Sequence, residues 1–314
     1  MASRTDTNPR RTWLLAVLPA VLFVAVLGFL YVRAQRLEEA IGTAGSPVIF
    51  IFSPDHGRNL AREDQRTLAS FLEAESGLAV EIRVASSPLD AIEAFGARAD
   101  IGLLGLFEYL VAREEYGVRA KLCVLREGGA GSYTGTIIVR TDSPIRSVAD
   151  LSGRRIAYVD PYSTSGFVFP AKLLADAHVH VTAEFAGSHA EALARVRAGR
   201  VDAAATYAGA GADDAEFRSI ATTDAIPNEP VVLRPGLSED KARRLVAALL
   251  KFAGTPEGHH ILGQIGGISG FRAGTDEEYR EVLEIARAAG TTVYDLVPEG
   301  VRIESRRRHI DYVP

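Results

Sequence analysis

Residues 155–177 read RIAYVDPYSTSGFVFPAKLLADA and contain the strand, the loop and the helix on which the fold depends. The run from Arg155 to Val159 predicts a short strand, and the segment from Phe167 to Ala177 predicts a helix. Similar pairs of strand and helix precede and follow this stretch. Because strands that alternate with helices form a mostly parallel sheet covered on both faces, the sequence predicts an α/β fold.

The chain is long enough for two such units, since 314 residues allow about two domains. We expect one lobe from residues 46–139 together with 236–300, a second lobe from residues 140–235, and a C-terminal tail over residues 301–314. Ligands of open α/β sheets lie beyond the carboxyl ends of the strands. Two hinged units of this kind would therefore close on a small ligand in the cleft between them.

The composition argues against several classes of function. The formal net charge of −5 gives no support for a nucleic-acid partner. The single cysteine, Cys123, excludes an intramolecular disulfide and a cysteine-rich metal site, and its apolar neighbours predict a buried side chain. We expect neither a cofactor nor a metal.

An uncharged stretch near the N-terminus predicts a membrane anchor. Residues 12–32 read TWLLAVLPAVLFVAVLGFLYV, about the length that crosses a bilayer as a helix. We expect residues 1–11 in the cytoplasm, 33–45 as a linker, and the remainder on the extracytoplasmic side of a bacterial inner membrane. Small residues between 40 and 44 leave cleavage after the span as an alternative.

The loop between the quoted strand and helix carries the clearest chemical signal. Ser163, Thr164 and Ser165 are consecutive hydroxyl residues, and Gly166 follows them at the start of a helix. Free backbone N–H groups and the positive end of the helix dipole meet at such a point, which favours a bound oxyanion. The alternative is ordinary helix capping, which needs only one of the hydroxyls.

Several short segments, taken in order, resemble the phosphonate-, phosphite- and phosphate-binding components of ABC transporters. The resemblance covers roughly residues 47–285. Its segments are YTGTII (133–138), DSPI (142–145), DLSG (150–153), DPYSTSGFVFP (160–170), FAGSH (185–189), GRVDA (199–203), IPNEP (226–230) and GISGF (267–271). The resemblance implies a two-lobed periplasmic-binding-protein fold of type II.

It also implies roles for particular residues. Ser163, Thr164 and Ser165 would hold the phosphorus oxygens, helped by the backbone N–H of Ser165 or Gly166. His189, in a Gly-Ser-His turn, would donate a ring N–H, and Tyr133 would offer its hydroxyl. The alternatives are a histidine satisfied by backbone at a helix start and a tyrosine in the core of a strand.

Glu229 matches a position at which phosphonate binders of this family carry an aspartate that holds a ligand ammonium group. The alternative is a carboxylate at the rim that pairs with Arg234. The first lobe departs further from the family, because residues 104–109 lack the expected aromatic hydroxyl. Ser53 and His56 could contribute to the ligand site, although a surface turn explains them equally well.

The function expected from these observations is binding without chemistry. The resemblance implies a membrane-tethered solute-binding protein that delivers its small phosphorus oxyanion to an ABC permease. A sensor lobe for a membrane signalling protein is an alternative. An enzyme on the same fold has little support, because the sequence has no H-E-x-x-H, Walker or nucleophile-elbow motif.

Overall fold

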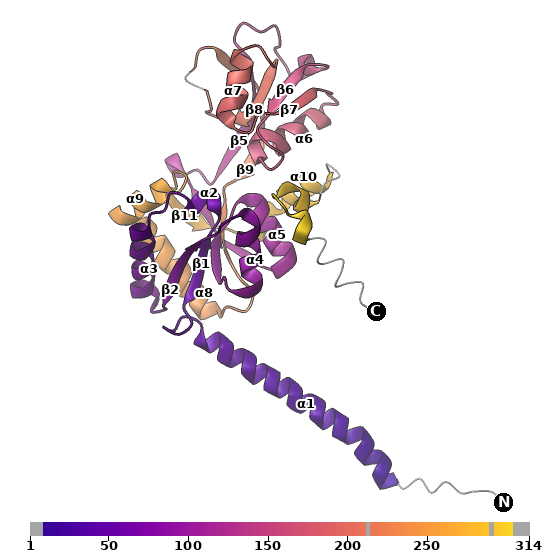
Figure 1. Ribbon diagram of the computed structural model, residues 1–314, viewed down its shortest axis with the longest axis vertical. Helices are drawn as coiled ribbons and strands as arrows, with labels where there is room; N and C mark the ends of the chain where they lie inside the picture. Colours follow the sequence, from indigo (N-terminus) through magenta and orange to yellow (C-terminus); the bar gives the residue numbers. More distant parts are fainter. Residues whose placement is uncertain (1–8, 212–213, 289–291, 304–314) are drawn as a thin grey trace, which may run out of the picture.

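Two separate β-sheets organise the chain (Figure 1). The computed structural model describes residues 9–211, 214–288 and 292–303. One sheet has six strands and the other has five, and each forms the centre of one lobe. The predicted two-lobed α/β architecture is therefore confirmed.

Lobe 1 contains the six-stranded sheet, in the order β11-β4-β10-β3-β1-β2. Its strands are β1 (Val48–Phe52), β2 (Val80–Val84), β3 (Ile101–Leu103), β4 (Arg119–Leu125), β10 (Pro230–Leu233) and β11 (Gly270–Ala273). Strand β1 runs parallel to β2 and β3, whereas β10 runs antiparallel to β3 and β4. The buried side chain of Cys123 lies in β4, as its apolar neighbours predicted.

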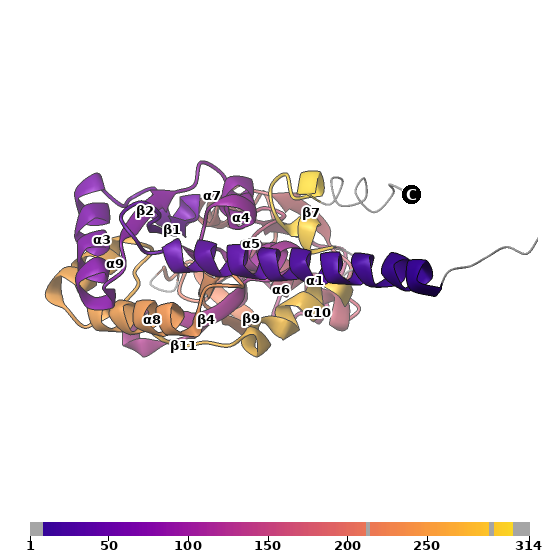
Figure 2. The ribbon, with the colours of Figure 1, turned by 90° about the horizontal axis from the view of Figure 1, so that it is seen from below.

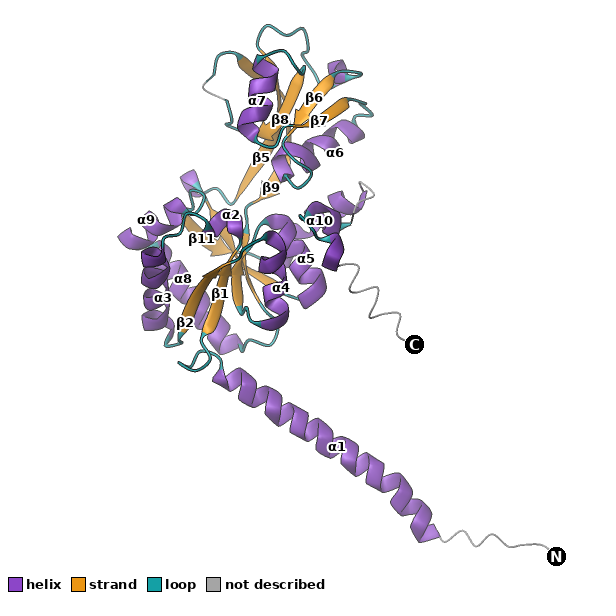
Figure 3. Cartoon of the chain, viewed as in Figure 1, coloured by secondary structure: helices purple, strands orange, loops and turns teal. Residues whose placement is uncertain are grey.

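Helices cover both faces of this sheet (Figure 3). One face packs against α3 (Arg62–Ser76), α8 (Glu239–Ala253) and α9 (Pro256–Gln264). The other packs against α4 (Pro88–Ala97), α5 (Leu106–Tyr116) and α10 (Arg280–Ala288). A single turn of helix, α2 (Pro54–Gly57), follows β1 at its carboxyl end. Burial of these apolar faces against the sheet supplies the main driving force for folding the lobe.

Lobe 2 contains the five-stranded sheet, in the order β7-β6-β8-β5-β9. Its strands are β5 (Ser132–Arg140), β6 (Arg155–Tyr158), β7 (Thr182–Phe185), β8 (Ala203–Tyr207) and β9 (Phe217–Pro227). Helix α6 (Phe169–Asp176) covers one face, and α7 (His189–Arg197) covers the other. Short turns of 3-10 helix are η1 (Glu127–Gly129), η2 (Ala149–Leu151), η4 (Asp276–Tyr279) and η5 (Val293–Leu296), and η3 (Thr164–Val168) is a π-turn.

The predicted lobe boundaries, at residues 139/140 and 235/236, differ from the sheet membership. All of β5 belongs to lobe 2, and all of β10 belongs to lobe 1. The chain therefore crosses between lobes at residues 126–131 and again at 228–229. Short apolar strands at a crossing look alike in sequence, and only their pairing shows which sheet they join. The long strand β9 and the short strand β11 were not predicted.

The two crossings are tied to each other by one buried amide. Asn228 Nδ2 donates hydrogen bonds to the carbonyl oxygens of Val124, at 3.0 Å, and Ala130, at 2.9 Å. The Asn228 side chain is almost completely buried. This arrangement fixes both connecting segments at one point, as a hinge between two lobes requires.

The N-terminal helix α1 (Pro9–Ala40) extends away from lobe 1 on the side opposite lobe 2 (Figures 1 and 2). Where side chains are described, from Val21 to Val32, the large apolar ones are exposed. Within the described residues, no helix meets the length and apolar character needed to span a membrane. The side chains of residues 12–20, in the first part of the predicted anchor, lie outside the described set.

Within the predicted linker at residues 33–45, helix α1 continues to Ala40, and its end contacts lobe 1. Lys241 Nζ lies 3.2 Å from Glu38 Oε1, which also accepts a hydrogen bond from the backbone N–H of Ser238. Gly42, with φ +87°, turns the chain toward β1 beside Leu78. The continuation of the helix beyond the apolar span agrees with the sequence, and the carboxylate of Glu38 pairs with a lysine in the first turn of α8.

Candidate functional site

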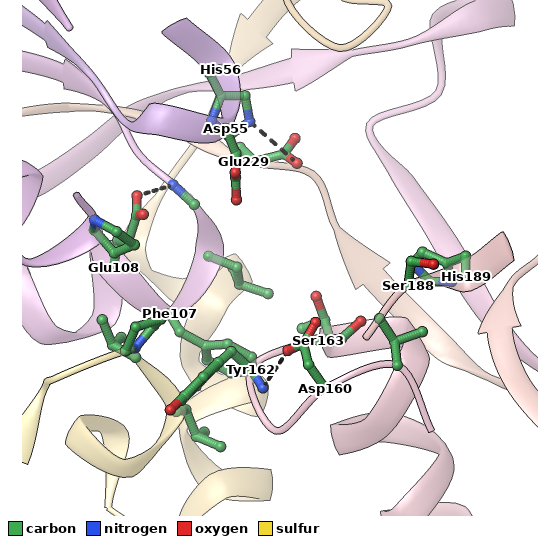
Figure 4. A pocket seen from close by; sticks show the side chains of 18 of the residues that line it. Asp55, His56, Phe107, Glu108, Asp160, Tyr162, Ser163, Ser188, His189 and Glu229 are labelled. Atoms are coloured by element: carbon green, nitrogen blue, oxygen red, sulfur yellow. Dashed lines mark hydrogen bonds and ion pairs between the residues drawn. The ribbon is translucent and has the colours of Figure 1, made fainter. Parts of the chain in front are cut away.

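A cleft of about 610 Å³ lies between the two lobes (Figure 4). Lobe 1 lines it with α2, the start of α5 and residues 296–298, and lobe 2 lines it with the loop before η3 and the start of α7. Ligand pockets of this size enclose small organic molecules and ions. The residues that line it are Asp55, His56, Pro88, Gly105, Leu106, Phe107, Glu108, Tyr133, Val159, Asp160, Tyr162, Ser163, Thr164, Gly187, Ser188, His189, Pro227, Glu229, Leu296, Val297 and Pro298.

The hydroxyl loop of lobe 2 forms the start of a π-turn. Ser163 Oγ accepts a hydrogen bond from the N–H of Gly166 at 3.0 Å, so its own hydroxyl proton remains available to donate. Its carbonyl oxygen accepts from the N–H groups of Phe167 and Val168. Ser163 is therefore both the cap of this turn and a donor at the cleft. At Ser163, the predicted anion site and the alternative of ordinary helix capping are therefore compatible.

The close packing around residue 166 leaves no room for a side chain, so a glycine is needed there. A Cβ atom at this position would lie 2.4 Å from Val159 Cγ2 and 2.7 Å from Ser163 Oγ. Ser165 is buried, and neither Ser165 nor Gly166 is among the residues that line the cleft. These two residues therefore lie behind the loop, where they shape it, whereas Ser163 and Thr164 face the cleft.

Tyr133, near the start of β5, contacts this loop. Its hydroxyl lies 3.2 Å from Thr164 Oγ1, and the residue lines the cleft. Burial raises the pKa of Tyr133, although its contact with Thr164 opposes that shift. The phenol consequently stays protonated at neutral pH and can donate one hydrogen bond.

His189 occupies the first turn of α7, next to the N-cap residue Ser188. Its Nδ1 lies 2.8 Å from Thr206 Oγ1, and its ring packs edge-on against Tyr207 at 4.9 Å between centroids. Burial lowers the pKa of His189, and the charge of Asp160 opposes this effect only in part. The imidazole is therefore mainly neutral at pH 7, with one nitrogen carrying a proton.

Glu229 lies in the second crossing and is flanked by two basic groups. Its Oε2 lies 2.8 Å from Arg126 Nη1, and its Oε1 lies 3.6 Å from His56 Nε2. Burial works against ionisation of Glu229, but attraction to the nearby side chains of His56 and Arg126 outweighs burial and lowers its pKa strongly. The alternative partner Arg234 is instead bound to Asp100, with Nε and Oδ1 2.6 Å apart.

His56 is held between lobe 1 and this carboxylate. Its Nδ1 lies 2.8 Å from Ser53 Oγ, at the end of β1. Both Ser53 and His56 are buried, and His56 faces the cleft (Figure 4). The turn that follows β1 is therefore part of the site wall rather than a simple surface turn.

Three further carboxyl groups line the cleft. Glu108 Oε2 accepts from the N–H of Gly105 at 2.8 Å, and burial raises the pKa of Glu108 to about 7. Asp55 pairs with Arg58 at the exposed edge of α2. Asp160 Oδ1 accepts from the N–H of Tyr162 at 2.7 Å and so holds the start of the hydroxyl loop.

The structure thus brings five predicted residues to one cleft: Tyr133, Ser163, Thr164, His189 and Glu229. The carboxyls Asp55, Glu108 and Asp160 and the segment at 296–298 were not predicted. Asp160 stands inside the quoted loop and could have been noticed there. Asp55 stands beside His56, and Glu108 lies in the segment 104–109 already compared with the family, so both could have been noticed as well. Residues 296–298 are brought in by long-range packing, for which the sequence carries no local signal.

Tyr109 does not fill the place of the missing aromatic hydroxyl in lobe 1. Its hydroxyl donates to Asp276 Oδ1 at 2.8 Å, and its ring packs edge-on against Tyr279. The side chain is fully buried in the lobe. Lobe 1 therefore presents His56 and the N-terminus of α5 to the cleft.

A family model described as "ABC transporter, phosphonate, periplasmic substrate-binding protein" matches residues 50–279. The phosphate-import protein PhnD of Mycolicibacterium smegmatis is 31% identical over 173 residues, which is 54% of each chain. The phosphonates-binding periplasmic protein of Escherichia coli is 29% identical over 175 residues, 50% of this chain and 51% of that protein. The chain thus spans about half the length of the curated relatives it matches.

Solved structures support the same fold. The protein XAC2383 from Xanthomonas citri, bound to chloride ion, superposes with a TM-score of 0.64 at 20% identity. The superposition covers 79% of this chain and 98% of that one. At this identity the likeness shows the fold alone.

Proposed function

Because this chain belongs to the family of phosphonate-type periplasmic substrate-binding proteins of ABC transporters, we propose that its cleft binds a small phosphorus oxyanion for uptake. The ligand is a phosphonate, phosphite or phosphate, and an ABC permease is the partner that receives it. The names of the two curated relatives, a phosphate importer and a phosphonate binder, agree with this ligand class. The protein acts by binding and release, without chemistry on the ligand.

The observation that carries the proposal is the convergence of neutral donors on one side of the cleft. The hydroxyls of Ser163, Thr164 and Tyr133 and the ring of His189 line it together. Oriented neutral donors can bind an oxyanion in a partly dry site, and a ligand that leaves them unpaired is penalised. In this proposal Ser165 and Gly166 shape the loop and offer backbone N–H groups.

The lobes close on the ligand about the two crossings at residues 126–131 and 228–229. The donors of lobe 2 then meet His56 and the N-terminus of α5, whose backbone N–H groups favour an anion. In this proposal, each lobe binds one part of the oxyanion. Closure and binding are thus the same event.

We also propose that α1 tethers the binding domain to the outer face of the inner membrane. The uncharged sequence of residues 12–32 and the exposed apolar side chains from Val21 to Val32 support the tether. Docking of Glu38 on Lys241 and Ser238 would hold lobe 1 in a fixed orientation at the end of α1. Carbonate extraction of membranes tests this part: the chain stays in the pellet if tethered and is released if it is not.

The direct test of the ligand class is calorimetric titration of the full chain, in mild detergent, with methylphosphonate, phosphite and phosphate. The proposal predicts micromolar or tighter binding to at least one of them. Sulfate provides a control for simple charge attraction. A folded chain that binds none of the three phosphorus oxyanions would contradict the proposal.

A further inference from the structure

The carboxyl groups of the cleft are mostly compensated from within the protein. Glu229 has Arg126 and His56, Asp55 has Arg58, and Glu108 is a cap for Gly105. Asp160, like Glu108, accepts a hydrogen bond only from a backbone N–H in the described contacts. Glu229 and Asp55, which have basic side chains beside them, therefore do not need a cation from the ligand to balance their charge.

Of these four carboxyls, Glu229 has two basic side chains close to it, both as ion-pair contacts and not as hydrogen bonds. Its two oxygens face two different basic side chains, at 2.8 Å to Arg126 and 3.6 Å to His56. Arg126 is fixed in turn, because its Nε donates to the carbonyl oxygen of Gly266 at 3.1 Å. A ligand ammonium group would have to displace one of these partners and would place a second positive charge beside that of Arg126 at the same carboxylate.

His56 has a different relation to the cleft. Its Nδ1 is engaged by Ser53 at 2.8 Å, but its Nε2 is 3.6 Å from Glu229, beyond hydrogen-bond distance. The Nε2–H group of His56 is therefore attracted to the Glu229 carboxylate but does not form a hydrogen bond with it. It can donate that hydrogen bond to a ligand instead. In Figure 4, His56 lies across the cleft from Ser163 and His189.

We infer that this cleft selects a phosphorus oxyanion without an ammonium group, with Glu229 positioning His56 and His56 donating Nε2–H to the anion. The inference rests on the proposed function and narrows it. In the Arg126–Glu229–His56 cluster the carboxylate is already paired with an arginine, so it offers no uncompensated negative charge to a ligand ammonium group. Glu229 is then a positioning residue, and its expected contact with a ligand amine is replaced by contacts within the chain.

The test compares methylphosphonate with 2-aminoethylphosphonate by calorimetry on the full chain. The inference predicts that methylphosphonate binds at least about tenfold more tightly. Equal or tighter binding of the amino compound would overturn it while leaving the proposed function intact. Binding of no phosphorus oxyanion at all would overturn the proposed function first.

Two variants, Arg126→Gln and His56→Gln, test the mechanism, and Arg83→Gln is the control. Arg126→Gln releases Glu229, so the affinity ratio should move toward 2-aminoethylphosphonate by about tenfold. Arg83→Gln removes an exposed charge paired with Glu81 in the same lobe and should leave the ratio unchanged. His56→Gln should weaken methylphosphonate by about tenfold even if Arg126→Gln does not fold. An unchanged ratio in a folded Arg126→Gln protein, or unchanged affinity in His56→Gln, would contradict the inference.

Discussion

The hydroxyl of Tyr133 lies 3.2 Å from Oγ1 of Thr164, and this contact joins the start of β5 to the loop that faces the cleft. Tyr133 belongs to β5, directly after the first crossing. Thr164 begins η3, directly after Ser163. This contact therefore fixes the loop that faces the cleft to the strand that follows the first crossing, within lobe 2.

Removing the hydroxyl of Ser163 tests the loop. Ser163→Ala loses a donor to the anion and the cap for Gly166, so ligand affinity should fall by about 1–3 kcal/mol. Titration calorimetry with the best ligand measures this change. Ser238→Ala removes a similar cap from α8, far from the cleft, and should cost stability without affecting affinity. Unchanged affinity in Ser163→Ala would show that the loop does not contact the ligand.

The close packing around Gly166 gives a second prediction. Gly166→Ala forces a methyl group against Val159 and Ser163, so the free energy of unfolding should fall by about 1–3 kcal/mol and ligand affinity should fall with it. Denaturant unfolding and titration measure the two effects. Gly263→Ala, where no atom lies within 4 Å of the new methyl group, is the matched control and should be neutral or slightly stabilising. A fully stable, tightly binding Gly166→Ala protein would contradict the loop geometry.

The buried side-chain amide of Asn228 gives a third prediction. Asn228→Ala removes the side-chain donor that reaches the carbonyl oxygens of Val124 and Ala130, so stability should fall by about 1–3 kcal/mol. Chemical denaturation followed by circular dichroism measures it. Asn59→Ala, at an exposed position, should change stability by less than about 0.5 kcal/mol. If both variants were equally stable, Asn228 would not tie the crossings together.

The raised pKa of Glu108 predicts that the stability of the folded protein depends on pH. Because burial raises its pKa to about 7, the folded protein binds this proton more tightly than the unfolded chain, whose carboxyl has a pKa of about 4.3. Its contribution to stability is complete at low pH and is lost as the pH rises from about 4.3 through 7. Glu108→Gln keeps an acceptor for Gly105 and should reduce the fall in melting temperature between pH 5 and pH 8. An identical fall in both proteins would show that Glu108 ionises normally.

Local patterns predicted the parts of the site that lie within a few residues of each other. The loop from Ser163 to Gly166 and the histidine at the start of α7 were identified because each stands where a strand passes into a helix. The ordered family segments predicted the family and the two-lobed fold, and both are confirmed. The roles of the individual residues in binding remain predictions.

Contacts between distant residues could not be predicted in this way. Arg126 was not expected beside Glu229, because the two residues are brought together only when β4, β10 and the crossings have paired. Arg234 was the nearer choice along the chain, but its strand places it beside Asp100. The same reason explains the misplaced lobe boundaries, since β5 and β10 reveal their lobes only through their pairing.

A crystal structure of the chain with methylphosphonate would test the central claim most directly. The account predicts closed lobes, with the phosphorus oxygens in contact with Ser163, Thr164 and Tyr133 on one side and His56 Nε2 on the other. It also predicts that Glu229 stays paired with Arg126. A ligand bound elsewhere, or in contact with only one lobe, would contradict it.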